Sequence, residues 1–198
     1  MHIVRSVSWV LFALAPVIGA GAQTGSPSFD CAKAESEAEK LVCSDEALAK
    51  LDGALASVYA KALESFPADE ISELKAYQRG WVKGRDECWK EDDLRTCVEL
   101  AYRTRIVELE IQSGQLEVPA PVDFACDGLE STRVVAVFYS ETDPPSVVLT
   151  VGDDQVIAFR SPAASGAKYD AANVELWEKG GEATLSWFGE THSCKTRS

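Results

Sequence analysis

From Phe29 to Ser113 the chain carries apolar residues at the spacing of an α-helix. The clearest stripe lies before Pro67, where apolar side chains recur three or four residues apart or at sums of these spacings: Leu48, Leu51, Leu55, Val58, Tyr59 and Phe66. Ser44 stands directly before Asp45 and Glu46, so we expect Ser44 to cap this helix at its start. Pro67 is expected to end it.

Two more long helices and a short one are predicted by the same spacing. Asp69 is placed to cap the second long helix, which carries Ile71, Leu74, Trp81 and Cys88. The third follows the acidic turn at residues 91–93 and has on one face Leu94, Val98, Ala101, Tyr102 and Leu109. A short helix over residues 35–42 is expected to precede them. Short loops between long helices favour antiparallel neighbours, so we predict a small helical bundle.

The periodicity changes to two after Asp123, which is typical of β-strands. Gly114 is expected to end the last helix, and residues 114–122 form a linker stiffened by Pro119 and Pro121. The alternating apolar sets that follow are Val135, Val137 and Tyr139, then Val147, Leu149 and Val151, then Val156 and Ala158. Turn signals separate them at residues 143–145, 152–154 and 180–181. Roughly six to eight short antiparallel strands predict a small closed barrel over residues 123–198. The fold class is therefore α + β in separate modules, with the helical one over residues 29–113.

Residues 1–22 have the features of a secretory signal peptide. Arg5 supplies the positive charge, residues 9–18 are an apolar run too short to span a bilayer, and Ala20-Gly21-Ala22 fits the cleavage rule. We expect the mature chain to begin at Gln23; an uncleaved membrane anchor is the alternative. The first cysteine is Cys31, far from the apolar run, so a lipid anchor is not expected. The prediction is a soluble bacterial protein of the periplasm or the exterior.

Six cysteines in an exported chain predict three disulfides. The pairs that we favour are Cys126 with Cys194, which would tie the ends of the barrel, Cys31 with Cys43, and Cys88 with Cys97. Among the four cysteines of the helical half the sequence leaves all three connectivities open. A zinc site is disfavoured because no C-x-x-C motif occurs, and no metal or other cofactor is expected.

The formal net charge of -13 disfavours nucleic acid and anionic lipid as partners. It suits a cationic partner, although solubility alone accounts for it equally well. A serine nucleophile would need a nearby base, and the only histidine of the mature chain, His192, is expected to be a solvated surface residue. Neither a phosphate-binding glycine loop nor a distinctive carboxylate pair stands out. We therefore predict that the protein is not an enzyme.

The most informative stretch places a Ser165–Tyr169 loop shortly before a hairpin turn at residues 177–181. The strand between them should bring both loops to the same region, with Ser165 and Lys179 presenting a hydroxyl and an ammonium outward. Taken alone, Lys179 has the features of an ordinary turn lysine. Four aromatic residues form either a glycan-stacking platform or, as we favour, packing of the barrel core and rim: Tyr169, Trp177, Trp187 and Phe188.

The segment from Phe124 to Cys194 resembles the MliC/PliC family of periplasmic inhibitors of c-type lysozyme. The matching motifs are Phe124-x-Cys126-Asp127-Gly128, Ser165-Gly166-Ala167-Lys168-Tyr169, Trp177-x-Lys179-Gly180, Glu182-Ala183-x-Leu185 and Cys194. The resemblance implies an eight-stranded antiparallel barrel. It also implies that Ser165 and Lys179 enter the lysozyme cleft and engage its two catalytic carboxylates. The lysozyme-binding residues implied in this way are Ser165, Gly166, Lys168, Tyr169, Lys179 and Gly180.

The helical half is similar to the N-terminal domain of LprI-like lysozyme inhibitors over residues 29–112. The matching residues are Asp30-Cys31-Ala32-Lys33-Ala34, Glu39-x-x-Val42-Cys43, Leu51-Asp52, Gln78-Arg79-x-Trp81, Arg85-x-x-Cys88 and Arg103-x-Arg105. Together the two resemblances predict a periplasmic two-module inhibitor of c-type lysozyme that blocks its catalytic cleft. The alternative is a non-catalytic protein that binds peptidoglycan or another envelope component. The sequence leaves the oligomeric state open.

Overall fold

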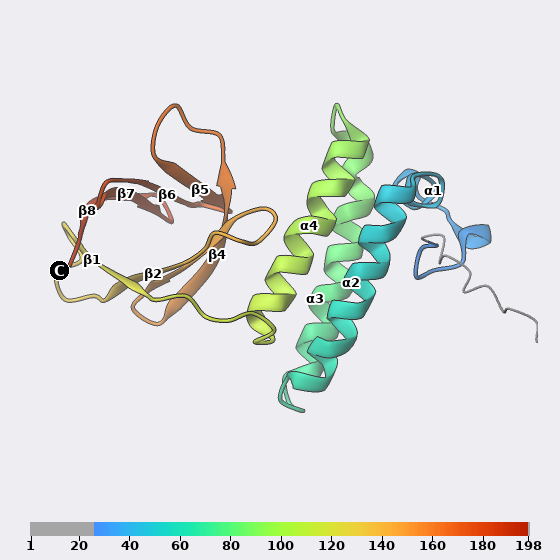
Figure 1. Cartoon of the computed structure of the whole chain (residues 1–198), viewed down its shortest axis with the longest axis horizontal. Helices are drawn as coiled ribbons and strands as arrows, with labels where there is room; N and C mark the ends of the chain where they lie inside the picture. Colours follow the sequence, from blue (N-terminus) through green and yellow to red (C-terminus); the bar gives the residue numbers. More distant parts are fainter. Residues whose placement is uncertain (1–25, 198) are drawn as a thin grey trace, which may run out of the picture.

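The computed structural model describes residues 26–197, which form a helical module followed by a closed β-barrel (Figure 1). This confirms the predicted α + β architecture. The predicted signal peptide, residues 1–22, lies outside the described residues. Among residues 26–197 no helix is both long and apolar enough to cross a membrane.

The helical module consists of three long helices and three short elements. Their bounds are η1 Cys31–Lys33, α1 Glu37–Ser44, α2 Glu46–Ser65, α3 Ile71–Asp86, η2 Glu87–Lys90 and α4 Leu94–Gln112. Helices α2, α3 and α4 lie side by side, and α1 contacts all three of them near one end of the bundle (Figure 1). The large side chains that are fully buried between the helices include Leu48, Val42, Val98, Tyr102 and Leu109. The predicted bundle and its apolar stripe are therefore present.

Two predicted helix caps, Ser44 and Asp69, are wrong, because each helix begins one residue later than expected. Ser44 is the last residue of α1, while Asp45 has an extended backbone and caps α2 instead. The Asp45 carboxylate accepts hydrogen bonds from two amides of the first turn of α2, at 2.9 and 3.2 Å. Asp69 lies in the turn before α3, whose N-cap Glu70 makes no side-chain cap bond.

The eight strands of the barrel pair in chain order and antiparallel, and β8 returns to pair with β1. Their bounds are β1 Val122–Cys126, β2 Val134–Tyr139, β3 Ser146–Val151, β4 Asp154–Ser161, β5 Ala167–Ala171, β6 Val174–Lys179, β7 Glu182–Trp187 and β8 Glu190–Thr196. The interior is apolar, and its largest fully buried side chains include Phe124, Leu149 and Leu185. Because β1 pairs with β8, none of the eight strands described has a free edge.

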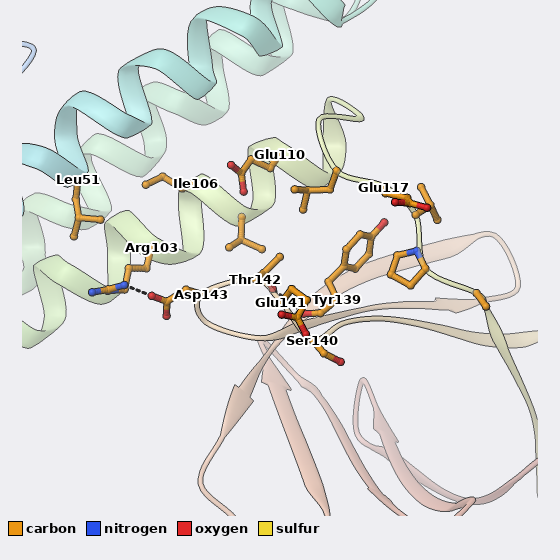
Figure 2. Close-up of a pocket in the computed structure, with 15 residues that line it drawn as sticks. Leu51, Arg103, Ile106, Glu110, Glu117, Tyr139, Ser140, Glu141, Thr142 and Asp143 are labelled. Carbon is orange, nitrogen blue, oxygen red and sulfur yellow. Dashed lines mark hydrogen bonds and ion pairs between the residues drawn. The ribbon is translucent and has the colours of Figure 1, made fainter.

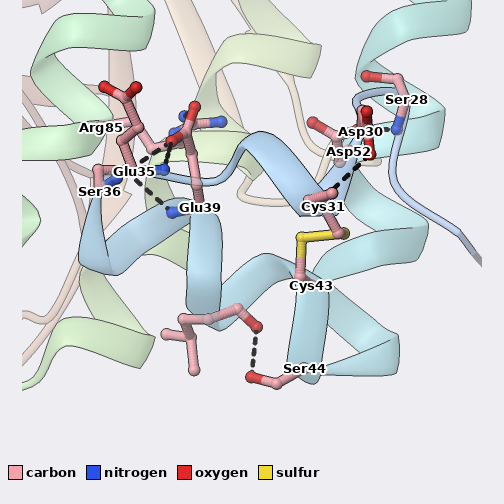
Figure 3. The surroundings of a disulfide bond; sticks show 12 residues. Ser28, Asp30, Cys31, Glu35, Ser36, Glu39, Cys43, Ser44, Asp52 and Arg85 are labelled. Atoms are coloured by element: carbon pink, nitrogen blue, oxygen red, sulfur yellow. Dashed lines mark hydrogen bonds and ion pairs between the residues drawn. A yellow bond between two sulfur atoms is a disulfide. The ribbon is translucent and has the colours of Figure 1, made fainter.

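The structure contains the three disulfides that the sequence favoured. Cys126 and Cys194 are direct partners across the β1–β8 seam, with Cα atoms 4.0 Å apart. The Cys31–Cys43 bond ties η1 to α1 (Figure 3), and the Cys88–Cys97 bond ties η2 to α4. One disulfide therefore locks the closure of the barrel, whereas the other two brace short local turns.

His192 is not the solvated surface residue that the sequence suggested. The polar tail is the eighth strand, and the alternation of that strand buries His192 and Cys194 on the same face. His192 is only 8% exposed, and its Nδ1 lies 2.9 Å from the carbonyl oxygen of Asp127. Because a carbonyl can only accept, Nδ1 carries the proton and donates it there.

The two modules touch through α4, the linker and the outer face of the barrel. Arg103 on α4 forms an ion pair with Asp143 in the β2–β3 turn. Val107, Val135, Tyr139 and Val148 are buried although they belong to neither core. The alternate set that includes Val135 and Tyr139 therefore faces away from the barrel interior, and Val134 and Ala136 fill the core instead.

Candidate functional site

The two loops that carry Ser165 and Lys179 lie side by side at one end of the barrel. Ser165 is in the β4–β5 connection, and Lys179 ends β6, which pairs with β5 through Ala167 and Glu178. The Lys179 ammonium donates a long hydrogen bond to the Ser165 hydroxyl, with Nζ and Oγ 3.5 Å apart. The structure therefore brings together the two side chains that the sequence singled out.

Gly166 allows this close approach because it has no side chain. Its φ of +73° lies in the left-handed region, and a Cβ at this position would stand 2.4 Å from the carbonyl oxygen of Glu178. That contact is to backbone, so it cannot be relieved by moving a flexible side chain. Any other residue at position 166 must push the two loops apart.

Two side chains outside the predicted site hold the Ser165 loop in place. The indole N–H of Trp177 donates to the carbonyl oxygen of Ser165 at 2.8 Å. The guanidinium of Arg160 donates to the carbonyl oxygen of Gly166 at 3.2 Å. Trp177 was visible in the sequence as part of the hairpin motif, but nothing in the pattern indicated Arg160. Both act as positioning residues for the loop.

The turn after Lys179 is a two-residue hairpin connection. Lys179 pairs with Glu182, and Gly180 and Gly181 between them have φ values of +63° and +85°. Positive φ at both central residues is the requirement of a type I′ turn, whose twist matches the flanking strands. The Glu178 carboxylate accepts from the Gly181 amide at 3.2 Å, which closes the turn. Lys179 therefore stands at a well-defined strand end.

The charge of Lys179 is not neutralised within the part of the chain that the structure describes. Its ammonium is exposed, and no carboxylate of residues 26–197 lies within ion-pair distance of it. Lys168 differs, because its ammonium lies 2.9 Å from Glu175 and 3.5 Å from Asp170. The hydrogen bond to Glu175 is the main cause that raises the pKa of Lys168. Only Lys179 of the two offers an uncompensated cation to a partner.

Tyr169 lies beneath the loops rather than among them. It is 4% exposed, belongs to the barrel core, and its ring lies 5.6 Å from the ring of Phe138. The guanidinium of Arg160 lies 5.6 Å from the Tyr169 ring centroid, so the same arginine connects the core to the Ser165 loop. Tyr169 is therefore placed to support the site from within.

The four aromatic residues that the sequence analysis grouped together do not form one surface. Tyr169 is inside, and Trp177 projects from the outer face with 43% of its surface exposed. Trp187 packs against the core and makes an edge contact with Phe188, with ring centroids 5.3 Å apart. Trp187 pairs with Val174, at the opposite end of β6 from Lys179. A continuous glycan-stacking platform is absent among these four side chains.

In the helical module, several residues of the LprI-like motifs form a buried polar network. Arg85 donates to the hydroxyl of Tyr102 at 2.7 Å, and that hydroxyl donates to the Asp52 carboxylate at 2.9 Å. Burial is the main cause that raises the pKa of Tyr102 well above its usual range. Trp81 packs edge-on against Tyr102 and donates its indole N–H to the carbonyl oxygen of Ala101 at 3.1 Å. Asp52, Arg85 and Tyr102 are buried, so they stabilise the bundle and are not available to a partner.

A second polar contact joins α1 to this network. Ser36 and Glu39 form a capping box in which each side chain accepts from the other's backbone amide, both at 3.1 Å (Figure 3). The Ser36 hydroxyl also donates to Asp86, whose carboxylate accepts from Arg85. The motif residue Glu39 therefore has a structural explanation as well.

Two family models match this chain, one for each module. The model described as "Membrane-bound lysozyme-inhibitor of c-type lysozyme", MliC, matches residues 124–193, and the model "Lysozyme inhibitor LprI" matches residues 31–116. Both resemblances noted in the sequence are thereby confirmed. Proteins named lipoprotein LprI, from Mycobacterium bovis and Mycobacterium tuberculosis, are 36% identical over 173 residues, covering 87% of this chain and 86% of theirs. No solved structure matches the chain.

Proposed function

Because the chain belongs to the LprI family of lysozyme inhibitors, we propose that it inhibits c-type lysozyme by inserting Ser165 and Lys179 into the catalytic cleft of the enzyme. The single observation that carries this proposal is the meeting of Lys179 Nζ and Ser165 Oγ at 3.5 Å on two mutually braced loops. The inhibitor acts by binding and is not itself a catalyst.

The chemistry of the two side chains suits the target. Lysozyme works with one protonated carboxylic acid and one ionised carboxylate facing each other in a cleft. The ammonium of Lys179 would pair with the ionised group, and the hydroxyl of Ser165 would exchange a hydrogen bond with the protonated acid. Neither side chain offers a glycosidic bond, so the cleft is occupied without turnover.

The preorganised loops reduce the cost of binding. Gly166, Trp177 and Arg160 already hold the Ser165 loop against the end of β6, so little freedom remains to be lost in the complex. The formal net charge of -13 would also attract a cationic enzyme and raise the association rate at low salt.

A lysozyme turbidity assay with the full chain tests the mechanism. Replacing Ser165 or Lys179 by alanine should in each case weaken the affinity for lysozyme by about 2–5 kcal/mol, because a desolvated partner is lost. Replacing both should remove inhibition at concentrations at which the wild type inhibits. Lys50→Ala is the control, since it removes an exposed lysine of α2 whose ion pair, within residues 26–197, is with Glu46. Wild-type inhibition by the double variant would show that the cleft is blocked by other residues, while the inhibitor function itself would stand.

We also propose an extracytoplasmic location, where lysozyme would be met. The similar mycobacterial proteins are named lipoproteins, whereas Cys31, the first cysteine of this chain, is bonded to Cys43. A form without lipid on Cys31 agrees with that disulfide. Fractionation of bacteria that produce the full chain tests this. Protein in the osmotic-shock fluid supports both the location and the lipid-free form, protein retained with the membranes contradicts only the lipid-free form, and protein in the cytoplasmic fraction contradicts the location.

A further inference from the structure

An apolar cavity of about 690 Å³ lies where the two modules meet (Figure 2). Its walls come from α2, α4, the linker and the β2–β3 turn, so it exists only because the barrel docks against the bundle. The side chains that line it are mainly apolar and include Leu51, Ile106, Val107, Leu116, Val118 and Pro119. A volume of this size is typical of pockets that hold a single small organic molecule.

The charged groups around the cavity are mostly acidic. Glu110, Glu117, Glu141 and Asp143 line it, and Arg103 is the only base among the lining residues. Arg103 is already occupied, because it donates to Glu99 at 2.9 and 2.6 Å and pairs with Asp143. No cation in the lining is left to attract an anionic ligand, so the electrostatic field favours a cation.

Glu110 is the charged group best placed to hold such a ligand. It is half-buried on α4, and Figure 2 shows it on the wall opposite Tyr139. Across residues 26–197 its carboxyl makes neither a hydrogen bond nor an ion pair. Burial raises the pKa of Glu110, and the positive charge of Lys61 on α2 opposes this shift. A partly desolvated carboxylate without a partner is costly, and a ligand ammonium would remove that cost.

We propose that the cavity between the modules binds a cationic amphiphile, an apolar chain or ring with one ammonium group. The apolar part lies against Ile106 and Val107, and the ammonium pairs with Glu110. This site is separate from the Ser165–Lys179 loops and does not depend on the lysozyme proposal.

Alkyl ions of matched length test the class of ligand on the full chain. Decyltrimethylammonium, used below its micelle concentration, is expected to bind at one saturable site measured by calorimetry. Decanoate, with the same apolar length and the opposite charge, should bind at least about tenfold more weakly. Tetramethylammonium, which keeps the charge but lacks the chain, should show no saturable binding. Amide NMR shifts should locate the cation at Ile106, Val107 and Tyr139.

Two variants separate the charge of the site from its volume. Glu110→Gln keeps the shape and should weaken decyltrimethylammonium binding at least about fivefold. Ala120→Trp, at an exposed lining position of the linker, should fill the cavity and block binding. The matched controls are Glu64→Gln, an exposed glutamate of α2, and Ala172→Trp, in the exposed β5–β6 turn; both should bind as the wild type does. Thermal unfolding of each variant shows whether it is folded.

Three results would overturn the proposal. The first is the absence of saturable binding of the decyl cation to the folded wild type. The second is decanoate binding as tight as that of the cation, which would remove the role of Glu110. The third is wild-type affinity in both Glu110→Gln and Ala120→Trp, which would place the ligand elsewhere on the acidic surface.

Discussion

The helical module and the barrel use their polar residues in opposite ways. In the helical module, Asp52, Arg85 and Tyr102 are buried and bonded to one another, so the chemically distinctive residues hold the helices together. In the barrel the interior is apolar, and the distinctive residues Ser165 and Lys179 stand on loops at its end. Substitutions at Ser165 and Lys179 should therefore leave the barrel core intact, whereas substitutions in the helical motifs should disturb the packing of the helices.

The two modules also differ in what their disulfides enclose. Cys126–Cys194 joins residues 68 apart in sequence and spans the seam of the barrel. Cys88–Cys97 joins residues only 9 apart and clamps a turn between two helices. The barrel therefore has one long-range crosslink, whereas the two disulfides of the bundle close short loops.

The largest effect is expected from removing the disulfide at the seam. In the chain-entropy model, Cys126→Ala with Cys194→Ala should destabilise the barrel by about 4 kcal/mol, because the crosslink closes a long loop of the unfolded chain. The matched pair Cys88→Ala with Cys97→Ala should cost the bundle about 2.5 kcal/mol by the same relation. Urea unfolding measures both, with circular dichroism at 222 nm reporting the helices and the amide NMR signals of the strands reporting the barrel. Equal losses, or a larger loss for the short loop, would contradict the contrast between the modules.

Breaking the buried network of the bundle should have the next largest effect. Arg85→Met leaves Asp86 and the Tyr102 hydroxyl without their buried donor and should cost about 3 kcal/mol. Arg95→Met is the control, because Arg95 is exposed and its pairs with Asp45 and Glu99 should contribute less than about 1 kcal/mol. Urea unfolding followed at 222 nm compares the two. A loss for Arg95→Met as large as that for Arg85→Met would mean that burial is not what makes the network strong.

At the site, Gly166→Ala should affect inhibition more than stability. The added Cβ meets the carbonyl oxygen of Glu178 and separates the loops, so we expect inhibition of c-type lysozyme to weaken by about tenfold or more. Gly114→Ala is the matched control, since Gly114 also has a positive φ of 67° but its Cβ would meet nothing. Both variants should lose about 1 kcal/mol of stability from backbone strain. Only Gly166→Ala should lose inhibition, and equal inhibition by the two variants would argue against the need for close loops.

The fold could be predicted from the sequence because its signals are local and redundant. The stripe from Leu48 to Phe66 and the alternation from Val147 to Val151 each repeat one period over several residues. The cap positions were less certain, because Ser44 and Asp45 are both good caps and only the backbone of the turn decides between them. His192 was misplaced because a polar strand without an apolar alternation resembles a tail.

The candidate site was predictable only where its residues lie on loops that neighbouring strands bring together. Ser165 and Lys179 could be paired in advance because the strands between their loops are short and adjacent. Arg160 could not, since it reaches the loop from β4 and its contact is to a backbone oxygen that any sequence would provide. The cavity between the modules could not be predicted either, because it depends on how the barrel docks against the helical bundle, and the pattern of each module alone does not determine this.

The smallest expected effect is the loss of stability at acid pH, which should differ between the two modules. Hydrogen bonds lower the pKa values of several carboxylates that cap or join helices: Glu39, Asp45, Asp93 and Glu99. Among the barrel residues described, hydrogen bonds also lower the pKa values of Asp123 and Glu130.

A carboxylate whose pKa is lower in the folded state stabilises that state fully above its unfolded pKa and loses the effect as the pH falls. Between about pH 5 and pH 3 the helical signal should therefore weaken before the barrel signal does. Glu110 acts in the opposite direction, because its pKa is raised and its protonation relieves a buried charge. Asp45→Asn keeps a side chain able to cap α2 but removes the charge that titrates, so it should flatten the acid dependence of the helical signal. If acid removes the helical and barrel signals together in the wild type, the two modules unfold as one unit. Their different bonding would then not give them separate stabilities.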